Sequence, residues 1–172
     1  MRYAGIIEND TVDINKGIAV SFWCQFCPHH CEGCHNPETW DKEGGYELPE
    51  DYIQQIIGLL KKNGIHRDLS ILGGEPLCDF NIQIVYDLVK TVKEKDDSVR
   101  VFVWTGGIFE KLKETYQDIF RYIDILVDGS FLLKERDITL PLRGSNNQRV
   151  IDVSKSLKEG KTITIPDEKL NG

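Results

Sequence analysis

The sequence lacks any apolar run that approaches the ~20 residues a helix needs to cross a bilayer. It also lacks a basic excess, because 21 Lys and Arg face 28 Asp and Glu and give a formal net charge of −7. The first residues mix charged and apolar side chains and contain no apolar stretch typical of a secretory signal. We therefore expect a soluble, cytoplasmic protein that binds neither membranes nor nucleic-acid phosphates.

Internal repeats, low-complexity tracts and linkers rich in Pro, Gly or Ser are absent as well. The chain has 172 residues, within the roughly 100–200 residues of one domain. Charged residues make up 28% of the chain and hydrophobic residues 40%, so extensive disorder is excluded. We predict a single domain over residues 1–172.

Short runs of β-branched and aromatic residues alternate with amphipathic stretches along the chain. The former predict strands, and the latter predict helices because their apolar residues recur every three or four positions. The predicted strands are 18–23, 69–72, 99–104 and 123–127, with 3–7 and 162–165 as additional edge strands, and the predicted helices are 50–62, 82–92 and 109–120.

This alternation favours βαβ units around a buried parallel sheet. A complete (βα)8 barrel takes about 250 residues, so this chain can supply only part of one. The predicted fold is therefore α/β, a partial TIM-like βα barrel whose sheet stays open on one side.

Four of the five cysteines, Cys24, Cys27, Cys31 and Cys34, fall within eleven residues. In a reducing compartment such clustering favours a metal site over disulfides. Two ligand sets are open. All four thiolates would close a zinc site or an electron-transfer cluster, whereas the last three would leave one iron without a protein ligand. The fifth cysteine, Cys78, is most simply a small buried hydrophobic residue.

Glycine-rich or polar loops follow all four main predicted strands. The cysteine loop follows the first strand, and residues 73–76 (Gly-Gly-Glu-Pro), 105–107 (Thr-Gly-Gly) and 128–130 (Asp-Gly-Ser) follow the others. Each loop alone could be an ordinary turn. Because ligands bind beyond the carboxyl ends of parallel strands, we expect one shared site.

The C-x3-C-x2-C spacing over residues 27–34, with Gly-Gly-Glu-Pro after the next strand, resembles the radical S-adenosylmethionine enzymes. Residues 27–40, 103–106 (Val-Trp-Thr-Gly), 126–131 (Leu-Val-Asp-Gly-Ser-Phe) and 143–148 (Arg-Gly-Ser-Asn-Asn-Gln) are more narrowly similar to the activating enzymes of anaerobic (class III) ribonucleoside-triphosphate reductase. The similarity extends from about residue 27 to residue 150.

The resemblance implies one 4Fe-4S cluster and S-adenosylmethionine as cofactors, with the partner reductase as protein substrate. Reductive cleavage of the cofactor would give a 5′-deoxyadenosyl radical, which takes a hydrogen atom from a backbone glycine of the reductase. A flavodoxin-like or other low-potential protein would donate the electron. The implied cluster ligands are Cys27, Cys31 and Cys34, and the implied cofactor-binding residues are Gly33, Cys34, His35, Gly73, Gly74, Glu75, Thr105 and Asp128.

On this interpretation Gly73 and Gly74 let the backbone approach the methionine portion, and Glu75 accepts from its ammonium group. A side chain at Gly74 would then displace the cofactor and leave the thiolates in place. His35 is a candidate to stack on the adenine, because Gly33 stands where many radical enzymes have an aromatic residue. No catalytic residue beyond the cluster and cofactor is implied.

Two alternatives stay open. The chain could activate another glycyl-radical enzyme, such as pyruvate formate-lyase, whose activases share the cysteine motif and Gly-Gly-Glu-Pro. It could also be a non-catalytic zinc or iron–sulfur module. His29 and His30 are not expected to bind iron, because three cysteines suffice, and Arg143 could meet either the cofactor carboxylate or the partner chain.

Overall fold

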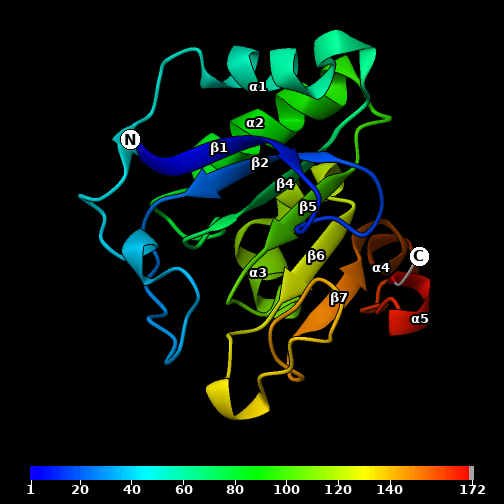
Figure 1. The fold of residues 1–172 in the computed structure, drawn as a ribbon. Coiled ribbons are helices and arrows are strands. Elements are labelled where there is room, and N and C mark those ends of the chain that lie inside the picture. Colours follow the sequence, from blue (N-terminus) through cyan, green and yellow to red (C-terminus); the bar gives the residue numbers. More distant parts are fainter. Residues whose placement is uncertain (171–172) are drawn as a thin grey trace.

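The computed structural model describes residues 1–170, whose strands form a seven-stranded sheet of order β3-β1-β2-β4-β5-β6-β7 (Figure 1). None of the helices in this range is long and apolar enough to cross a membrane. The strands are β1 (Arg2–Asp10), β2 (Ala19–Cys24), β3 (Tyr46–Glu47), β4 (Asp68–Gly73), β5 (Val101–Trp104), β6 (Ile125–Asp128) and β7 (Arg149–Asp152). The α-helices are α1 (Tyr52–Leu60), α2 (Ile82–Lys95), α3 (Phe109–Thr115), α4 (Val153–Glu159) and α5 (Asp167–Leu170), and the 3-10 turns are η1 (Pro37–Thr39), η2 (Lys62–Gly64), η3 (Gln117–Tyr122) and η4 (Leu133–Glu135).

The centre of the sheet is parallel, as the sequence predicts. Strands β2, β4, β5 and β6 pair in parallel in that order, and they match the four main predicted strands. The predicted strand 3–7 lies within β1, which pairs antiparallel with both β2 and β3. Since β3 and β7 are the two ends of this strand order, the sheet is open and the α/β class is confirmed.

The fold differs from the prediction in several features, among them β3, α4 and α5, which were not predicted. Strand β7, which pairs antiparallel with β6, was not predicted, because its run of apolar residues is too short to indicate a strand. Residues 162–165 form no strand and contribute one bridge, between Thr164 and Ile151. The predicted helix 109–120 divides into α3 and η3, because the backbone leaves the helical region at Tyr116 (φ −124°, ψ 47°).

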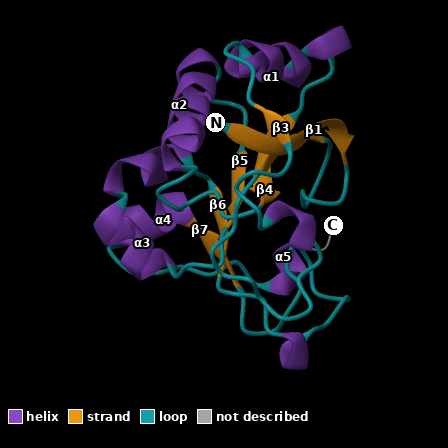
Figure 2. Cartoon of the chain, turned by 90° about the vertical axis from the view of Figure 1, so that its left-hand side faces the viewer, coloured by secondary structure: helices purple, strands orange, loops and turns teal. Residues whose placement is uncertain are grey.

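The two faces of the sheet are covered differently (Figure 2). Helices α1 to α4 bury their apolar sides on one face and form the larger core. In α1 the buried residues Tyr52, Ile56 and Leu60 are four positions apart, which places them on one side of the helix. The opposite face carries a smaller core under the connections 11–18 and 129–148 and helix α5.

Candidate functional site

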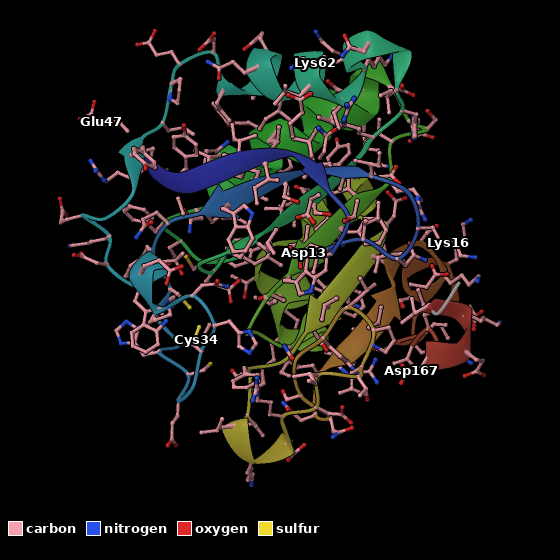
Figure 3. The ribbon with its side chains drawn as sticks, in the orientation of Figure 1. Asp13, Lys16, Cys34, Glu47, Lys62 and Asp167 are labelled. Carbon is pink, nitrogen blue, oxygen red and sulfur yellow. The ribbon has the colours of Figure 1, made fainter. Side chains whose placement is uncertain are left out.

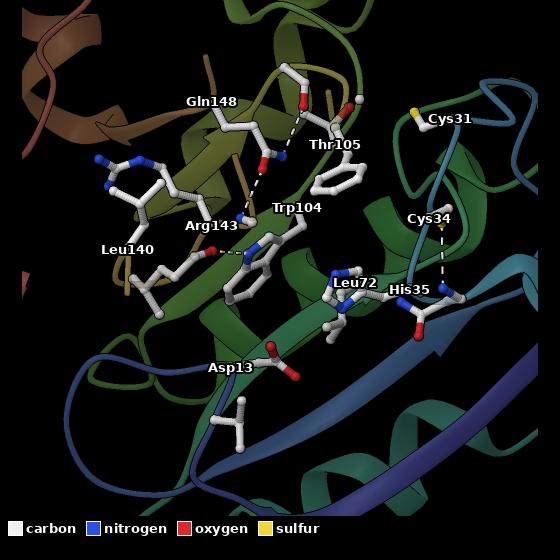
Figure 4. Close-up of a pocket in the computed structure, with 18 of the residues that line it drawn as sticks. Asp13, Cys31, Cys34, His35, Leu72, Trp104, Thr105, Leu140, Arg143 and Gln148 are labelled. Carbon is white, nitrogen blue, oxygen red and sulfur yellow. Dashed lines mark hydrogen bonds between the residues drawn. The ribbon is translucent and has the colours of Figure 1, made fainter. Parts of the chain in front are cut away.

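A cavity of about 710 Å³ lies on the face of the sheet opposite helices α1 to α4, at the carboxyl ends of the parallel strands (Figure 4). Figure 3 shows Cys34 beyond the strand ends and Asp13 over the sheet itself, so the cavity extends between the two. The residues of interest that line it are Asp13, Trp23, Cys27, His29, Cys31, Cys34, His35, Leu72, Gly73, Gly74, Glu75, Trp104, Thr105, Gly106, Gly129, Phe131, Leu140, Leu142, Arg143 and Gln148.

The structure brings most of the predicted site residues to this one cavity. All three implied cluster ligands line it, together with residues that follow β4 and β5. Gly33 and Asp128 do not line it. The predicted site residues that line the cavity are Cys27, Cys31, Cys34, His35, Gly73, Gly74, Glu75 and Thr105.

The cysteines of the loop differ sharply in their surroundings. Cys27, Cys31 and Cys34 are half-buried free thiols on the cavity, whereas Cys24 is fully buried. Cys24 belongs to the core on the helix side of the sheet, because it points away from its neighbour Trp23, which lines the cavity. Burial raises the pKa of the Cys24 thiol well above its usual value. The geometry therefore separates Cys24 from the other three.

Hydrogen-bond donors accompany the cavity thiols. Burial raises the pKa of Cys27 to about 11, while the backbone amides of His29 and His30 act in the opposite direction. The backbone amide of Asn36 donates to Cys34 Sγ at 3.4 Å. Within residues 1–170, no three His, Cys, Asp or Glu side chains converge on a point where they could hold a single metal ion.

The glycine pair after β4 is held against the cysteine loop. Gly73 has a φ of +98°, which favours glycine, and the amide of Gly74 donates to the Cys24 carbonyl at 2.8 Å. A Cβ at Gly74 would lie 2.3 Å from the carbonyl oxygen of Phe26. A side chain here would first meet the backbone that carries the thiolates, which argues against the expectation that it leaves them in place.

Glu75 is a buried residue, 2% exposed, and its carboxylate connects three loops. Oε1 accepts from Thr105 Oγ1 at 2.7 Å and from the amide of Leu77 at 2.9 Å. Oε2 accepts from His29 Nε2 at 2.7 Å and from the amide of Gly106 at 2.8 Å. A carboxylate offers about four acceptor sites, so groups of the chain itself occupy those of Glu75.

Asp128 has a packing role in this structure. Its carboxylate is fully buried and accepts from Arg149 Nε at 2.9 Å and from the amide of Phe109 at 2.8 Å. Gly33 lies in the turn between Cys31 and Cys34 with a φ of +72°, and a Cβ there would lie 2.8 Å from Leu133 Cδ1. Both residues therefore support the loops that surround the cavity.

Arg143 lines the cavity and forms a bidentate pair with Asp167, with Nη1 and Nη2 at 2.7 and 2.9 Å from the carboxylate oxygens. Its Nε is buried without a hydrogen-bond partner in the described chain. The pair with Asp167 was not evident from the polar loop 143–148 alone, because Asp167 is distant in sequence.

Phe131, Asp13 and Asn81 were not given a role in the site by the sequence analysis. The Phe131 ring makes an edge contact with His35 at 5.7 Å between ring centroids. The pKa of Asp13 is raised to about 7, mainly by burial and then by the charge of Asp10. Asn81 Nδ2 donates to the carbonyls of Gln25 at 2.8 Å and Glu75 at 2.9 Å. In the sequence, Asn81 is distinguished only by its position just before the predicted helix 82–92. That position suggests a helix N-cap and gives no indication that the side chain connects two loops.

The sequence is similar to known proteins. Residues 15–151 match the family described as a 4Fe-4S single cluster domain. Proteins named "anaerobic ribonucleoside-triphosphate reductase-activating protein" are similar over nearly their full length. The one from Vibrio cholerae is 35% identical over 86% of this chain and 96% of the relative. Those from Escherichia coli K12 and phage T4 are each 32% identical over 87% of this chain, covering 97% and 93% of the relatives.

The chain belongs to the anaerobic ribonucleoside-triphosphate reductase-activating protein family. Membership of this family, together with the 4Fe-4S domain, supports the iron–sulfur interpretation of the cysteine loop over a zinc module. The three cavity thiols also fit such a cluster chemically, since thiolates are its usual protein ligands.

Proposed function

We propose that this protein is an oxidoreductase that activates anaerobic ribonucleoside-triphosphate reductase by generating a glycyl radical on it with S-adenosylmethionine. The observation that carries the proposal is the meeting of the C-x3-C-x2-C thiols and the Gly-Gly-Glu-Pro loop at one cavity, in a chain whose relatives bear that name. The same names favour the reductase over a pyruvate formate-lyase as the partner.

Cys27, Cys31 and Cys34 would hold the 4Fe-4S cluster, and the burial of Cys24 on the helix side supports this three-ligand set. Three thiolates leave one iron open for a cofactor. When bound, the cluster would supply the electron for reductive cleavage of S-adenosylmethionine, and this chemistry would remove a hydrogen atom from the partner's glycine.

Side chains around the cavity would bind and shield the cofactor. The volume of about 710 Å³ lies within the roughly 300–1,000 Å³ of ordinary small-molecule sites. Gly73, Gly74 and Thr105 offer close-lying backbone and hydroxyl groups, and His35 offers a ring for the adenine. Gly33, Glu75 and Asp128 would act by holding these loops in place. Apolar residues such as Trp104 would exclude water from a reactive radical.

The fold supports a protein substrate. We interpret β2, β4, β5 and β6, with their helices, as a partial TIM-like barrel of the radical S-adenosylmethionine type in a single domain. An incomplete barrel leaves its cavity accessible from one side, which suits a glycine segment of a large partner. A flavodoxin-like or other low-potential protein is the proposed electron donor.

Electron-spin resonance under anaerobic conditions tests the proposal. The reduced protein with S-adenosylmethionine and the reductase should give a stable doublet signal on the reductase, and a Gly→Ala change at the partner's acceptor glycine should remove it. Cofactor cleavage with a signal that forms only on a pyruvate formate-lyase would instead show that the chain activates that other glycyl-radical enzyme. A colourless protein with stoichiometric zinc would contradict both.

A further inference from the structure

Two large apolar side chains lie almost fully exposed at the opening of the cavity. Val12 and Ile138 are each 79% exposed, more than any other large hydrophobic residue that the structure describes. Both line the cavity, Val12 from the connection 11–18 and Ile138 from the connection 129–148. A residue that lines a cavity and is also exposed lies at its edge. Scattered apolar residues are normal on a surface, whereas two at one opening indicate an interaction site.

The rest of the opening carries little exposed charge. Among the described residues that line the cavity, the exposed ones are Val12, His29, His35 and Ile138. None of these four has a carboxylate, ammonium or guanidinium group, although 28% of the residues in the chain are charged. Arg143 also lines the cavity, but it is less exposed and its guanidinium is paired with Asp167. The opening therefore favours a neutral, apolar occupant.

Val12 is held in place by a buried aspartate. The amides of Val12 and Asp13 donate to Asp10 Oδ1 at 2.8 and 3.1 Å. Asp10 is itself buried and accepts a further hydrogen bond from Ser21 Oγ of β2. The hydroxyl of Ser70, in β4, donates to the Asp13 carbonyl at 2.5 Å. The turn that carries Val12 is thus attached to two strands of the sheet.

Ile138 lies on a turn that is closed at its base. The amide of Asp137 donates to the carbonyl of Gly144 at 3.1 Å, and Arg136 and Ser145 form an antiparallel bridge. The backbone therefore holds Ile138 in position without any contact from a partner. Side chains that are fixed before binding lose little entropy when a partner covers them. Both apolar residues are thus arranged in advance for an occupant.

The position of these two residues favours the protein substrate over the electron donor. Cys34 lies beyond the ends of the strands, whereas Asp13, the neighbour of Val12 in the chain, lies over the sheet (Figure 3). An electron donor would approach the cysteine loop, at the first of these places. The acceptor glycine would have to enter the cavity, and the residues on either side of it would pass the opening.

We propose that Val12 and Ile138 form a docking site for the segment of the reductase that carries the acceptor glycine, by contacting apolar side chains next to that glycine. This inference rests on the proposed function. A glycine has no side chain for an enzyme to recognise, so its neighbours in the segment provide the recognition. Val12 and Ile138 would thereby determine which glycine enters the cavity.

The variants Val12→Ser and Ile138→Ser test the inference, with Ile138→Leu as the conservative change. Ile65→Ser is the matched control, because Ile65 is also an exposed apolar residue but does not line the cavity. Each cluster-loaded protein is reduced with dithionite, so that no donor protein takes part. The initial rate of glycyl-radical formation is then followed by electron-spin resonance over a range of reductase concentrations. Iron content and S-adenosylmethionine affinity are measured in parallel.

Each Ser variant should raise the reductase concentration that gives the half-maximal rate by about tenfold, because burial of one large apolar side chain changes an equilibrium constant by this order. The rate at saturating reductase, the iron content and the cofactor affinity should stay at the parent values. Ile138→Leu and Ile65→Ser should both behave like the parent. A purely structural role would instead lower the iron content or the saturating rate.

A change in the reductase provides a second test. Replacing the apolar residues beside its acceptor glycine with Ser should weaken its interaction with the parent protein and add little to the effect of Ile138→Ser. This change leaves the present chain intact, so it decides the matter if Ile138→Ser fails to hold a cluster. Independent, additive effects of the two changes would overturn the inference, and so would an acceptor glycine that has only polar neighbours.

Other results also count against the inference. Parent-like half-maximal concentrations in both Ser variants would exclude a docking role, and an equal loss of cofactor affinity would assign the two residues to the cofactor. A dimer of the parent that dissociates in Ile138→Ser would identify a second copy of the chain as the occupant. A parent protein that forms no radical on the reductase would instead contradict the proposed function, so the two failures are distinguishable.

Discussion

The backbone amide of Glu75 donates to the carbonyl oxygen of Phe26 at 2.8 Å. Through this bond and the one from Gly74 to Cys24, the backbone after β4 lies directly against the backbone that leads into the cysteine loop. At Gly74 this approach leaves no room for a side chain, because an added Cβ would lie 2.3 Å from the carbonyl oxygen of Phe26. The Gly-Gly-Glu-Pro loop is therefore a support for the cysteine loop as well as a wall of the cavity.

Gly74→Val should lower both cluster content and cofactor binding, because its Cβ would meet the Phe26 carbonyl at 2.3 Å. Iron content and S-adenosylmethionine titration, measured on the same reconstituted sample, check this. Gly58→Ala in α1 is the control, since nothing lies within 4 Å of its added Cβ. That change should stabilise the helix by about 0.5–1 kcal/mol. A Gly74→Val protein with full cluster and weak cofactor binding would contradict the steric argument.

Ala substitution of Cys27, Cys31 or Cys34 should abolish cluster binding and cofactor cleavage together. Cys24→Ala should retain both and lose only about 1 kcal/mol of unfolding free energy, because it removes a buried side chain from the core on the helix side. Iron and sulfide analysis with the visible absorption of anaerobically purified variants measures the outcome. Loss of iron from Cys24→Ala as complete as from Cys31→Ala would mean four thiolate ligands.

Asp13→Asn should change how stability depends on pH. The pKa of Asp13 is about 7 in the folded chain against an ordinary value of 3.8, so between these values the folded state binds the extra proton. The free energy of unfolding therefore falls as pH rises from about 4 to about 7, and the Asn variant lacks this loss. Each pKa unit corresponds to about 1.4 kcal/mol, so the variant should gain at least about that much relative to the parent by pH 8.

Urea titrations of parent and variant at pH 5 and pH 8 measure this difference. Asp97→Asn is the matched control, because the Asp97 side chain is 95% exposed. The same pH response in Asp13→Asn and the parent would show that the Asp13 carboxyl titrates normally.

Asp128→Asn should destabilise the fold by roughly 1.5–3 kcal/mol, since it weakens the hydrogen bonds that a fully buried carboxylate accepts from Arg149 and from the amide of Phe109, while Glu110 still pairs with Arg149. Cluster content should be unchanged in the protein that remains folded. Chemical denaturation gives the free energy, and Asp118→Asn, in an exposed pair with Arg121, should differ from the parent by less than about 1 kcal/mol. Unchanged stability with a large loss of cofactor affinity would place Asp128 on the cofactor instead.

Sequence reasoning located the parts of the site that local patterns encode. Short spacing identified the cysteine loop, and the resemblance to radical S-adenosylmethionine enzymes implied Cys27, Cys31 and Cys34 as the ligands and Gly73 and Gly74 as cofactor-binding residues. All five line the cavity. The parallel strands followed from their apolar runs between helices, and their order along the sheet then brings the loops together.

The parts it missed depend on contacts between distant segments. Strand β7 is defined by pairing with β6, because only Val150 and Ile151 are buried in it. The sequence of either loop taken alone does not indicate the hydrogen bond between His29 and Glu75. Asp128 looked like a ligand because it follows a strand, and only the position of Arg149 shows its pairing.

The hydrogen bonds of Glu75 to other loops also constrain the order in which the protein can fold and bind iron. Its carboxylate binds His29, 46 residues earlier, and Thr105 and Gly106, 30 and 31 residues later. During synthesis the four cysteines of the loop leave the ribosome before Glu75, Thr105 and Gly106, so Glu75 cannot complete its hydrogen bonds to the loop after β5 until β5 has joined the sheet. Contacts of such long sequence separation slow folding, because the entropy of loop closure opposes them. We therefore expect iron to be loaded into a completed fold, and a chain truncated before residue 105 to accept none.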